Sequence, residues 1–272
     1  FSDAMASEVP PQVEETHTKI LGWPTDILSV DFPSASDATT KDVVPHTVLI
    51  MIPGNPGQYN WYTSDLVKLV QRLGHGFAAR ALSHAGHSLG GKEGIVDVQD
   101  YARRNSNADP AVPWTIEGQV RHKIAFIDAL MAEWSNHNTQ NPPNFIFLGH
   151  SFGCYVIQRI CVQRKEILDR TLGFLHLMPF IRMKAHSFDQ RKLDLGAYNP
   201  QALITLGTAV SKTYKALPKS WVDTFVKMGI HDDKTRDIAL QILRDPKFIK
   251  NFFMLGTEEI RDIPRDIDVS AG

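Results

Sequence analysis

Residues 145–153 read FIFLGHSFG, a run of four apolar residues followed by the pattern Gly-x-Ser-x-Gly. The continuous apolar run predicts a strand buried on both faces. The residues after Ser151 predict a helix, so the serine falls on a sharp strand-to-helix turn. Such a turn lifts the serine hydroxyl above the edge of a sheet, where a substrate can reach it. We therefore predict Ser151 as a catalytic nucleophile.

The residue types around Ser151 suit this chemistry. Gly149 and Gly153 leave room for a strained backbone and for close strand–helix packing, and His150 completes the turn. A helix N-terminus offers free N–H groups that stabilise an oxyanion, so the N–H of Phe152 is one predicted donor. The alternative is a Gly/Ser-rich turn that merely caps a helix. The strand before and the helix after the turn favour the nucleophile.

A second loop of interest follows the apolar run VLIMI at residues 48–52 and reads PGNPG at residues 53–57. In serine hydrolases of the α/β type, the loop after an early strand supplies a second oxyanion donor. Pro56 has no N–H, so we predict Asn55 as that donor, in a turn that contains Gly54. A plain Gly/Pro turn is the alternative. Both loops follow strands, and ligands bind at that edge of open α/β sheets.

The alternation of strands and helices predicts an α/β-hydrolase fold, with a doubly wound, mostly parallel sheet. Beyond Pro179 the strand-like runs stop, and the remaining stretches predict a helical cap over one edge of the sheet. We divide the chain into a hydrolase core at 1–181 and a cap at 182–268 that form one functional unit. The expected strands are 18–21, 26–31, 48–52, 77–82, 145–148 and 172–177, and the expected helices are 63–73, 116–134, 200–216, 221–228, 235–243 and 248–260.

The bulk composition is that of an ordinary soluble protein. Of the 272 residues, 43% are hydrophobic and 22% charged, and the formal net charge is −1. Lys and Arg are scattered, which argues against a nucleic-acid partner. No apolar run approaches the ~18–20 residues that a membrane-spanning helix needs. Cys154 and Cys161 lie about 10 Å apart at helical rise, so we expect free, buried thiols.

The segment SHAGHS at residues 83–88 contains a His-x-x-His pair, which could supply two ligands of a zinc site. No cysteine or nearby carboxylate offers a third ligand, and the segment is expected to be a loop. We therefore predict a structural turn beside the site, with no metal and no cofactor.

Acyl transfer by a serine also needs a base and an acid, which in this fold follow the serine in the order acid, then histidine. The histidines after Ser151 are His176, His186 and His231. We expect His176 within a strand and His186 exposed. The run His231-Asp232-Asp233 invites a His–Asp pair, but a helix N-cap is the expected role.

Glu258 would be a candidate acid if residues 251–258 formed a strand, but the flanking apolar residues favour a helix. No histidine follows His231, so neither structure would complete a triad. We therefore expect the acid and the histidine to lie beyond Gly272, the last strands of the sheet to be missing, and this chain to be catalytically impaired.

The motifs PGNPG, SHAGHS and GHSFG, in this order, resemble those of the lipid droplet-associated hydrolase family over residues 46–268. The resemblance implies a serine esterase or lipase-like enzyme with a helical cap, acting on sterol esters or other neutral lipids. It implies a place at the lipid droplet surface, on its cytoplasmic face or in association with the endoplasmic reticulum. By residue match it carries over Ser151 as nucleophile and Asn55 in the oxyanion loop. In the family, the acid and the histidine follow a segment resembling Met254–Asp268.

Two rival functions stay open: a non-catalytic protein of the lipid droplet surface, and a thioesterase with the same site geometry. A dehalogenase or an epoxide hydrolase would need Asp at the nucleophile position, so Ser151 argues against both. Five aromatic residues of the predicted cap could either contact lipid or pack inside the cap, and the sequence does not decide between these roles. They are Trp221, Phe225, Phe248, Phe252 and Phe253.

Overall fold

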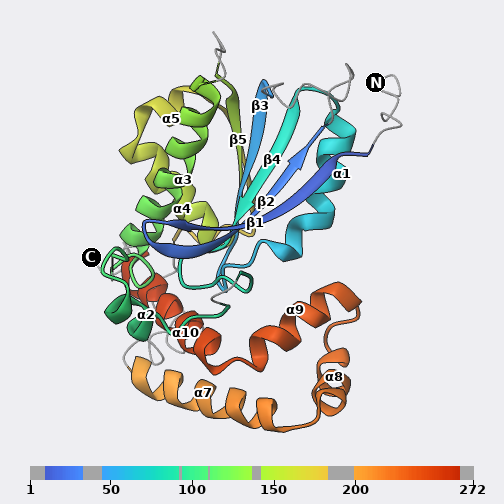
Figure 1. The fold of residues 1–272 in the computed structure, drawn as a ribbon, viewed down its shortest axis with the longest axis vertical. Helices are drawn as coiled ribbons and strands as arrows, with labels where there is room; N and C mark the ends of the chain where they lie inside the picture. Colours follow the sequence, from blue (N-terminus) through green and yellow to red (C-terminus); the bar gives the residue numbers. More distant parts are fainter. Residues whose placement is uncertain are drawn as a thin grey trace, which may run out of the picture.

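The computed structural model describes residues 10–32, 45–91, 94–109, 111–136, 142–182 and 199–263 (Figure 1). Within these ranges the strands form one six-stranded sheet in the order β1-β2-β4-β3-β5-β6. The first two strands are antiparallel to their neighbours, and β4, β3, β5 and β6 run parallel. The strands are β1 (Gln12–Ile20), β2 (Trp23–Asp31), β3 (Thr47–Ile52), β4 (Phe77–Leu82), β5 (Asn144–His150) and β6 (Thr171–Leu177).

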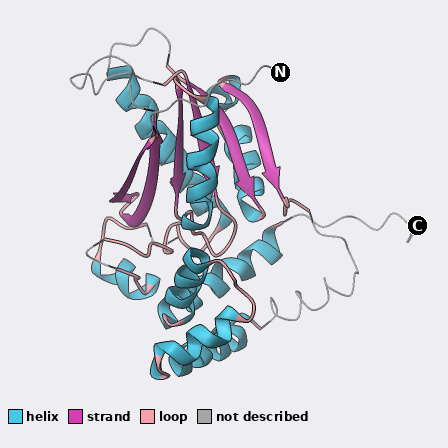
Figure 2. Cartoon of the chain, turned by 90° about the vertical axis from the view of Figure 1, so that its right-hand side faces the viewer, coloured by secondary structure: helices cyan, strands magenta, loops and turns pink. Residues whose placement is uncertain are grey.

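Helices cover both faces of this sheet (Figure 2). All six residues of β3 are buried, and their side chains alternate between two apolar clusters. Val48 and Ile50 pack with α3 and α4, whereas Leu49 and Met51 pack with α1. The predicted α/β-hydrolase fold, with a doubly wound and mostly parallel sheet, is confirmed. The helices of this part are α1 (Thr63–Leu73), α2 (Val98–Arg104), α3 (Ile116–Asn136), α4 (Phe152–Gln163) and α5 (Lys165–Asp169), with a short 3-10 turn at Asn60–Tyr62.

The two N-terminal strands are longer than the runs expected at 18–21 and 26–31, because β1 and β2 pair along their whole length as a hairpin. Both cysteines lie buried and free on α4, as predicted. No helix within the described ranges is both long enough and apolar enough to cross a membrane.

Four helices lie at the carboxyl ends of the parallel strands, as Figure 1 shows in orange to red. The last of these helices packs through Leu255 into the apolar cluster that contains residues of β3, α3 and α4. Ile263, the residue after this helix, belongs to the same cluster. The division into a core at 1–181 and a cap at 182–268 stays a prediction. The four helices are α7 (Pro200–Ala216), α8 (Lys219–Lys227), α9 (Asp233–Leu243) and α10 (Pro246–Asp262).

Strand β6 forms one edge of the described sheet, and its apolar side chains are exposed on both faces. Leu172 is 63% exposed and Leu175 is 50% exposed, although a strand of this composition is usually buried. An apolar edge of this kind is a template for pairing with another strand.

Candidate active site

Ser151 lies between β5 and α4 with φ 50° and ψ −120°, a backbone conformation that a residue with a side chain rarely adopts. Hydrogen bonds on both sides of the residue hold this turn. The Ser151 N–H donates to the carbonyl of Leu177 at 2.9 Å, and the Ser151 carbonyl accepts from Cys154 N and Phe180 N, each at 3.1 Å. The sharp turn expected from the sequence is therefore present, and the serine is half-buried rather than sealed in the core.

The glycines beside Ser151 have no room for a side chain. A Cβ on Gly153 would lie 2.1 Å from the carbonyl oxygen of Ile52, and a Cβ on Gly149 would lie 2.9 Å from Cys154 Cα. These contacts are with backbone atoms, which cannot rotate away. We call this strand-to-helix turn at residues 149–153 the elbow, and it depends on glycine at both positions.

The structure brings the two predicted loops together. A Cβ on Gly54 would lie 3.0 Å from Ser151 Cβ and 3.0 Å from His150 Nδ1. The predicted donors, the N–H groups of Asn55 and Phe152, take part in none of the described turn, loop or cap hydrogen bonds. Phe152 is the first residue of α4, where N–H groups have no partner within the helix. Both N–H groups are thus available to an oxygen beside Ser151.

Tyr62 joins this site, although nothing in the sequence marked it. Its hydroxyl lies 2.8 Å from His150 Nδ1. Burial raises the pKa of Tyr62 to about 12, partly offset by hydrogen bonding with the Gly54 backbone, and burial lowers the pKa of His150. Tyr62 therefore links the Gly54 loop to the residue before Ser151 as a neutral hydroxyl.

The SHAGHS loop packs behind the elbow. His84 donates its backbone N–H to the Gly57 carbonyl at 3.0 Å, and its ring meets Phe152 edge-on with 5.6 Å between centroids. Burial holds the pKa of His84 well below its usual range. Neither ring nitrogen of His84 has a hydrogen-bond partner. No group of three metal-ligating residues occurs within the described ranges.

A buried polar network supports that loop from α3. Lys123 donates to the carbonyl of Ser83 at 2.9 Å and lies 3.0 Å from His122 Nδ1, and His122 Nε2 lies 2.8 Å from Thr25 Oγ1. Both side chains are fully buried, and burial holds their pKa values well below the usual range. A neutral amine and a neutral imidazole can remain in this environment, whereas two cations could not.

The histidines that follow Ser151 do not converge on it. His176 lies on β6 opposite Gly149, and its buried Nε2 has no partner. His231 is exposed, and Asp232 beside it is the N-cap of α9, accepting from Thr235 N at 2.7 Å, as predicted. His186 lies outside the described residues. Within the described ranges, no hydrogen bond joins a histidine ring to Ser151.

The two adjacent glutamates of α10 have different environments. Glu258 lies in the helix, not in a strand, and pairs with Arg261 at 3.3 Å. Glu259 is 7% exposed and lies against Asn55, where burial raises its pKa to about 8. No motif in the sequence indicates a role for Glu259. Its spacing of four residues from the buried Leu255 was the available signal.

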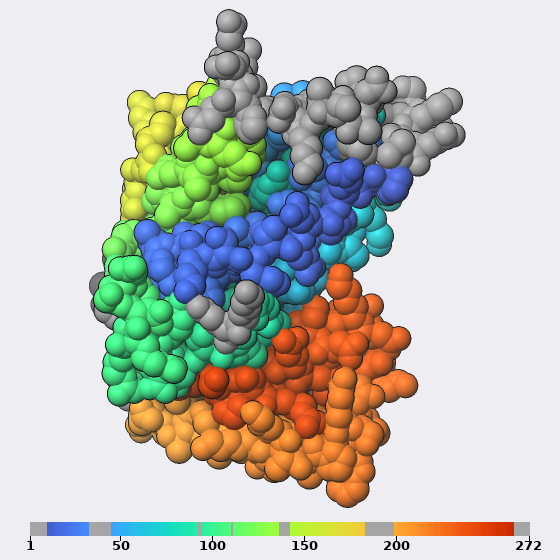
Figure 3. Space-filling view, viewed as in Figure 1, coloured from blue at the N-terminus to red at the C-terminus, as the bar shows by residue number. Residues whose placement is uncertain are grey.

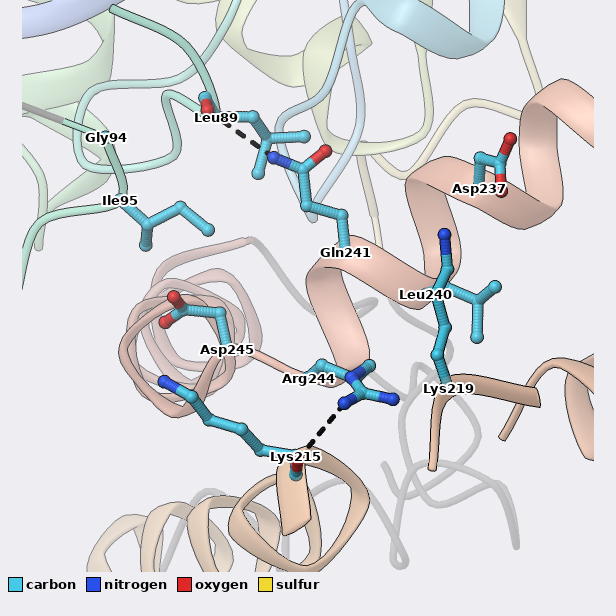
Figure 4. Close-up of a pocket in the computed structure, with 10 residues that line it drawn as sticks. All are labelled: Leu89, Gly94, Ile95, Lys215, Lys219, Asp237, Leu240, Gln241, Arg244 and Asp245. Atoms are coloured by element: carbon cyan, nitrogen blue, oxygen red, sulfur yellow. Dashed lines mark hydrogen bonds between the residues drawn. The ribbon is translucent and has the colours of Figure 1, made fainter. Parts of the chain in front are cut away.

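A cavity of about 670 Å³ lies between α9, the end of α7 and residues Leu89, Gly94 and Ile95 (Figure 4). Its wall mixes apolar side chains with three cations and two carboxylates. Ser151 is not part of that wall, so this cavity is separate from the elbow. The lining residues are Leu89, Gly94, Ile95, Lys215, Lys219, Asp237, Leu240, Gln241, Arg244 and Asp245.

Comparison with known sequences places the chain near one family. The family profile described as lipid-droplet associated hydrolase matches residues 45–271. The lipid droplet-associated hydrolase of Gallus gallus is 26% identical over 241 residues, which cover 85% of this chain and 66% of that protein. The Mus musculus protein of the same name is 30% identical over 177 residues, covering 64% and 50%. The chain therefore spans about half to two thirds of the length of these relatives.

Comparison with solved structures supports the fold. A haloalkane dehalogenase from Agrobacterium tumefaciens superposes with a TM-score of 0.55 at 13% identity, covering 95% of this chain and 71% of that one. A deformylase from Pseudomonas putida gives a TM-score of 0.50 at 9% identity, covering 93% and 75%. At these identities the likeness shows the α/β-hydrolase fold alone.

Proposed function

The chain belongs to the lipid droplet-associated hydrolase family, and from this membership we propose that it cleaves carboxylic esters of lipids with Ser151 as the nucleophile. Sterol esters or other neutral lipids are the proposed substrates. The observation that carries the proposal is the strained Ser151 turn with the Gly54 loop directly beside it. Two free N–H groups, those of Asn55 and Phe152, support it further.

The proposed reaction proceeds through an acyl-enzyme. Ser151 Oγ attacks the ester carbonyl carbon and its proton passes to a base, while the carbonyl oxygen becomes an oxyanion. The N–H groups of Asn55 and Phe152 donate to that oxyanion. The carbonyl then re-forms, the carbon–oxygen bond to the alcohol breaks, and the alcohol oxygen takes up the proton from the base. Water finally hydrolyses the acyl group from Ser151. We assign no histidine as the base, because none within the described ranges is hydrogen-bonded to Ser151.

A fluorophosphonate probe tests this proposal. It should label the chain at Ser151, and Ser151→Ala should remove the label. Labelling should be slow, because no described histidine activates the hydroxyl. The exposed Ser220 on α8 provides the control, since Ser220→Ala should leave labelling unchanged. A wild-type chain that never reacts would favour the non-catalytic lipid-surface protein.

We further propose that α8 contacts the lipid surface. Three of its large apolar side chains face solvent: Trp221 is 66% exposed, Phe225 is 61% exposed, and Met228 at the helix end is 79% exposed. The opposite face packs into the cap through Val222 and Val226. By contrast, Phe248 is fully buried, and Phe252 and Phe253 pack against its cluster.

The charges of this part of the cap fit an anionic lipid surface. The exposed lysines of α7 and α8 are Lys212, Lys215, Lys219 and Lys227, and Asp223 is the one acidic residue in these two helices. Figure 3 shows α7 and α8, in orange, at the lower boundary of the molecule, away from the sheet. An apolar stripe flanked by lysines is typical of helices that lie in the interface of a membrane.

Replacing the two aromatic side chains tests this contact. Trp221→Ser with Phe225→Ser should weaken binding to phospholipid-coated triolein droplets at least about tenfold in a flotation assay, because two large apolar groups no longer enter the lipid. Val162, 81% exposed on α4, is the matched control, and Val162→Ser should float like the wild type. Equal flotation of the double variant and the wild type would exclude α8 as the contact.

A further inference from the structure

The side chain of Tyr62 extends from the start of α1 to the elbow. Tyr62 is the last residue of the 3-10 turn at Asn60–Tyr62, and its N–H donates to the Tyr59 carbonyl at 2.8 Å. The helix that follows is fixed to the sheet, because Leu66 and Val70 are buried in the apolar cluster that α1 shares with β3. The core therefore holds the backbone of Tyr62 and gives its hydroxyl a defined position.

The hydroxyl of Tyr62 meets the ring of His150 where the Gly54 loop, residues 53–57, touches the elbow. Tyr62 Oη lies 2.8 Å from His150 Nδ1, and the two rings have 5.8 Å between their centroids. A Cβ on Gly54 would lie 3.0 Å from that same nitrogen and 3.0 Å from Ser151 Cβ. A side chain at position 54 would crowd the ring, so glycine lets the loop, the ring and the hydroxyl come together beside the nucleophile.

The Tyr62–His150 contact is the one side-chain hydrogen bond within the described ranges that joins residues 53–62 to the elbow. The backbone hydrogen bonds of Ser151 run elsewhere, to α4, to the end of β6 and to Phe180. None of them reaches the Gly54 loop. The position of the loop relative to the elbow therefore depends on this one side-chain bond and on packing.

Both partners of this bond are neutral near pH 7. Burial raises the pKa of Tyr62 to about 12, and burial lowers the pKa of His150 below its usual value. The bond therefore does not depend on a charge, and removing the hydroxyl deletes the bond without leaving a buried ion. Tyr62→Phe is a conservative change for this reason, since it removes one oxygen atom and retains the ring.

We propose that Tyr62 is a positioning residue that holds the Gly54 loop against the elbow through its hydrogen bond with His150. The N–H of Asn55, the next residue of the loop, is thereby kept beside Ser151. Its position matters because an oxyanion hole works only when its donors lie at hydrogen-bonding distance from the developing charge. A displacement of about 1 Å in an active site can lower the rate about 100-fold. This inference rests on the proposed function, because it concerns the oxyanion side of the same site.

The rate of Ser151 labelling by a fluorophosphonate tests this role. Tyr62→Phe should lower the maximal labelling rate about tenfold and leave the half-saturating probe concentration unchanged, because the hydroxyl acts through the loop. Tyr101→Phe is the matched control. It removes a hydroxyl that donates to the Gly22 carbonyl at 3.1 Å in a different apolar cluster. It should therefore lower the urea midpoint to a similar extent and label like the wild type.

Two outcomes of this comparison would overturn the proposal. One is an equal maximal labelling rate in Tyr62→Phe and the wild type. The other is an equal slowing in Tyr101→Phe, which would assign the effect to a general loss of stability.

A double variant shows whether Tyr62 acts through His150. His150→Ala removes the other partner of the bond, so it should slow labelling by itself. In the His150→Ala background, Tyr62→Phe should cause no further slowing, because the bond that it deletes is already absent. Independent effects that multiply in the double variant would contradict the proposed route.

Two measurements on the folded chain test the same contact without catalysis. In the nitrogen NMR spectrum, Tyr62→Phe should shift the Nδ1 resonance of His150, whereas Tyr101→Phe should leave it in place. Amide hydrogen exchange within residues 54–58 should be severalfold faster in Tyr62→Phe than in the wild type, and unchanged in Tyr101→Phe. If Ser151 reacts in no chain but both results hold, the proposed function fails and Tyr62 still holds the loop. An unchanged Nδ1 resonance would refute the bond, and equal exchange in all three chains would show that Tyr62 does not hold the loop.

Discussion

Gly153→Ala is expected to remove most of the stability of the fold. Its Cβ would lie 2.1 Å from the Ile52 carbonyl oxygen and 2.6 Å from the Pro53 carbonyl oxygen, well inside the distance at which atoms repel. Both obstacles are backbone atoms at the end of the central strand β3. Neither can turn away, because β3 is buried between helices on both faces.

The clash can be relieved only by separating α4 from β3. That separation would open the core on which Val156 and Ile157 of α4 pack, so we expect a loss of more than about 4 kcal/mol in the free energy of unfolding. A loss of this size is comparable with the whole stability of many domains. Urea denaturation of the purified variant measures it directly.

Gly173→Ala on β6 is the matched control for this prediction. A Cβ at Gly173 meets nothing within 4 Å, so we expect a change within about 0.5 kcal/mol. A Gly153→Ala chain as stable as Gly173→Ala would show that α4 does not pack against β3 as described. The elbow geometry around Ser151 would then be wrong as well.

The strands near the elbow could be predicted because each apolar pattern there fits only one kind of secondary structure. A strand buried on both faces is a continuous apolar run, so β3 and β5 were expected within about two residues of their observed ends. The helix α7 was expected at 200–216 and begins at Pro200, a residue that suits the first turn of a helix.

Side-chain environments in the cap could not be predicted in the same way. Trp221 and Phe248 both lie on amphipathic helices, yet one is 66% exposed and the other fully buried. Glu258 and Glu259 are neighbours, yet only Glu259 faces Asn55. In each pair the outcome depends on which helix face meets a distant segment, and that information is not local to the sequence. Tyr62 reaches His150 across 88 positions for the same reason.

Acidification is expected to produce the second large loss of stability, through the buried histidines of the SHAGHS loop. Burial lowers the pKa of His87 to about 4, against about 6.5 in an unfolded chain. Between these values the unfolded state binds more protons, so stability falls as the pH drops from about 6.5 to about 4. The difference of about 2.5 units corresponds to roughly 3 kcal/mol from His87 alone. His84 and His122 are shifted in the same direction and add to the loss.

Glu259 acts with the opposite sign over an overlapping range. Its folded pKa of about 8 lies above the unfolded value, so the folded state binds more protons between about 4.5 and 8 and stability falls as the pH rises there. The two slopes partly cancel in the wild type between about 4.5 and 6.5. The contribution of His87 must therefore be measured as a difference between two chains at each pH.

Urea denaturation of the wild type and of His87→Gln from about pH 7 to about pH 4 measures that difference. The variant removes the hydrogen bond from His87 Nδ1 to the Ala85 carbonyl, so it should be the less stable chain at neutral pH. It also removes the proton-binding site, so its deficit should shrink by roughly 3 kcal/mol as the pH approaches 4. His231→Gln, at an exposed position, should follow the wild type throughout. A His87→Gln deficit that stays constant with pH would mean that the His87 ring is hydrated in the folded chain, and the loop behind the elbow would then be open to water.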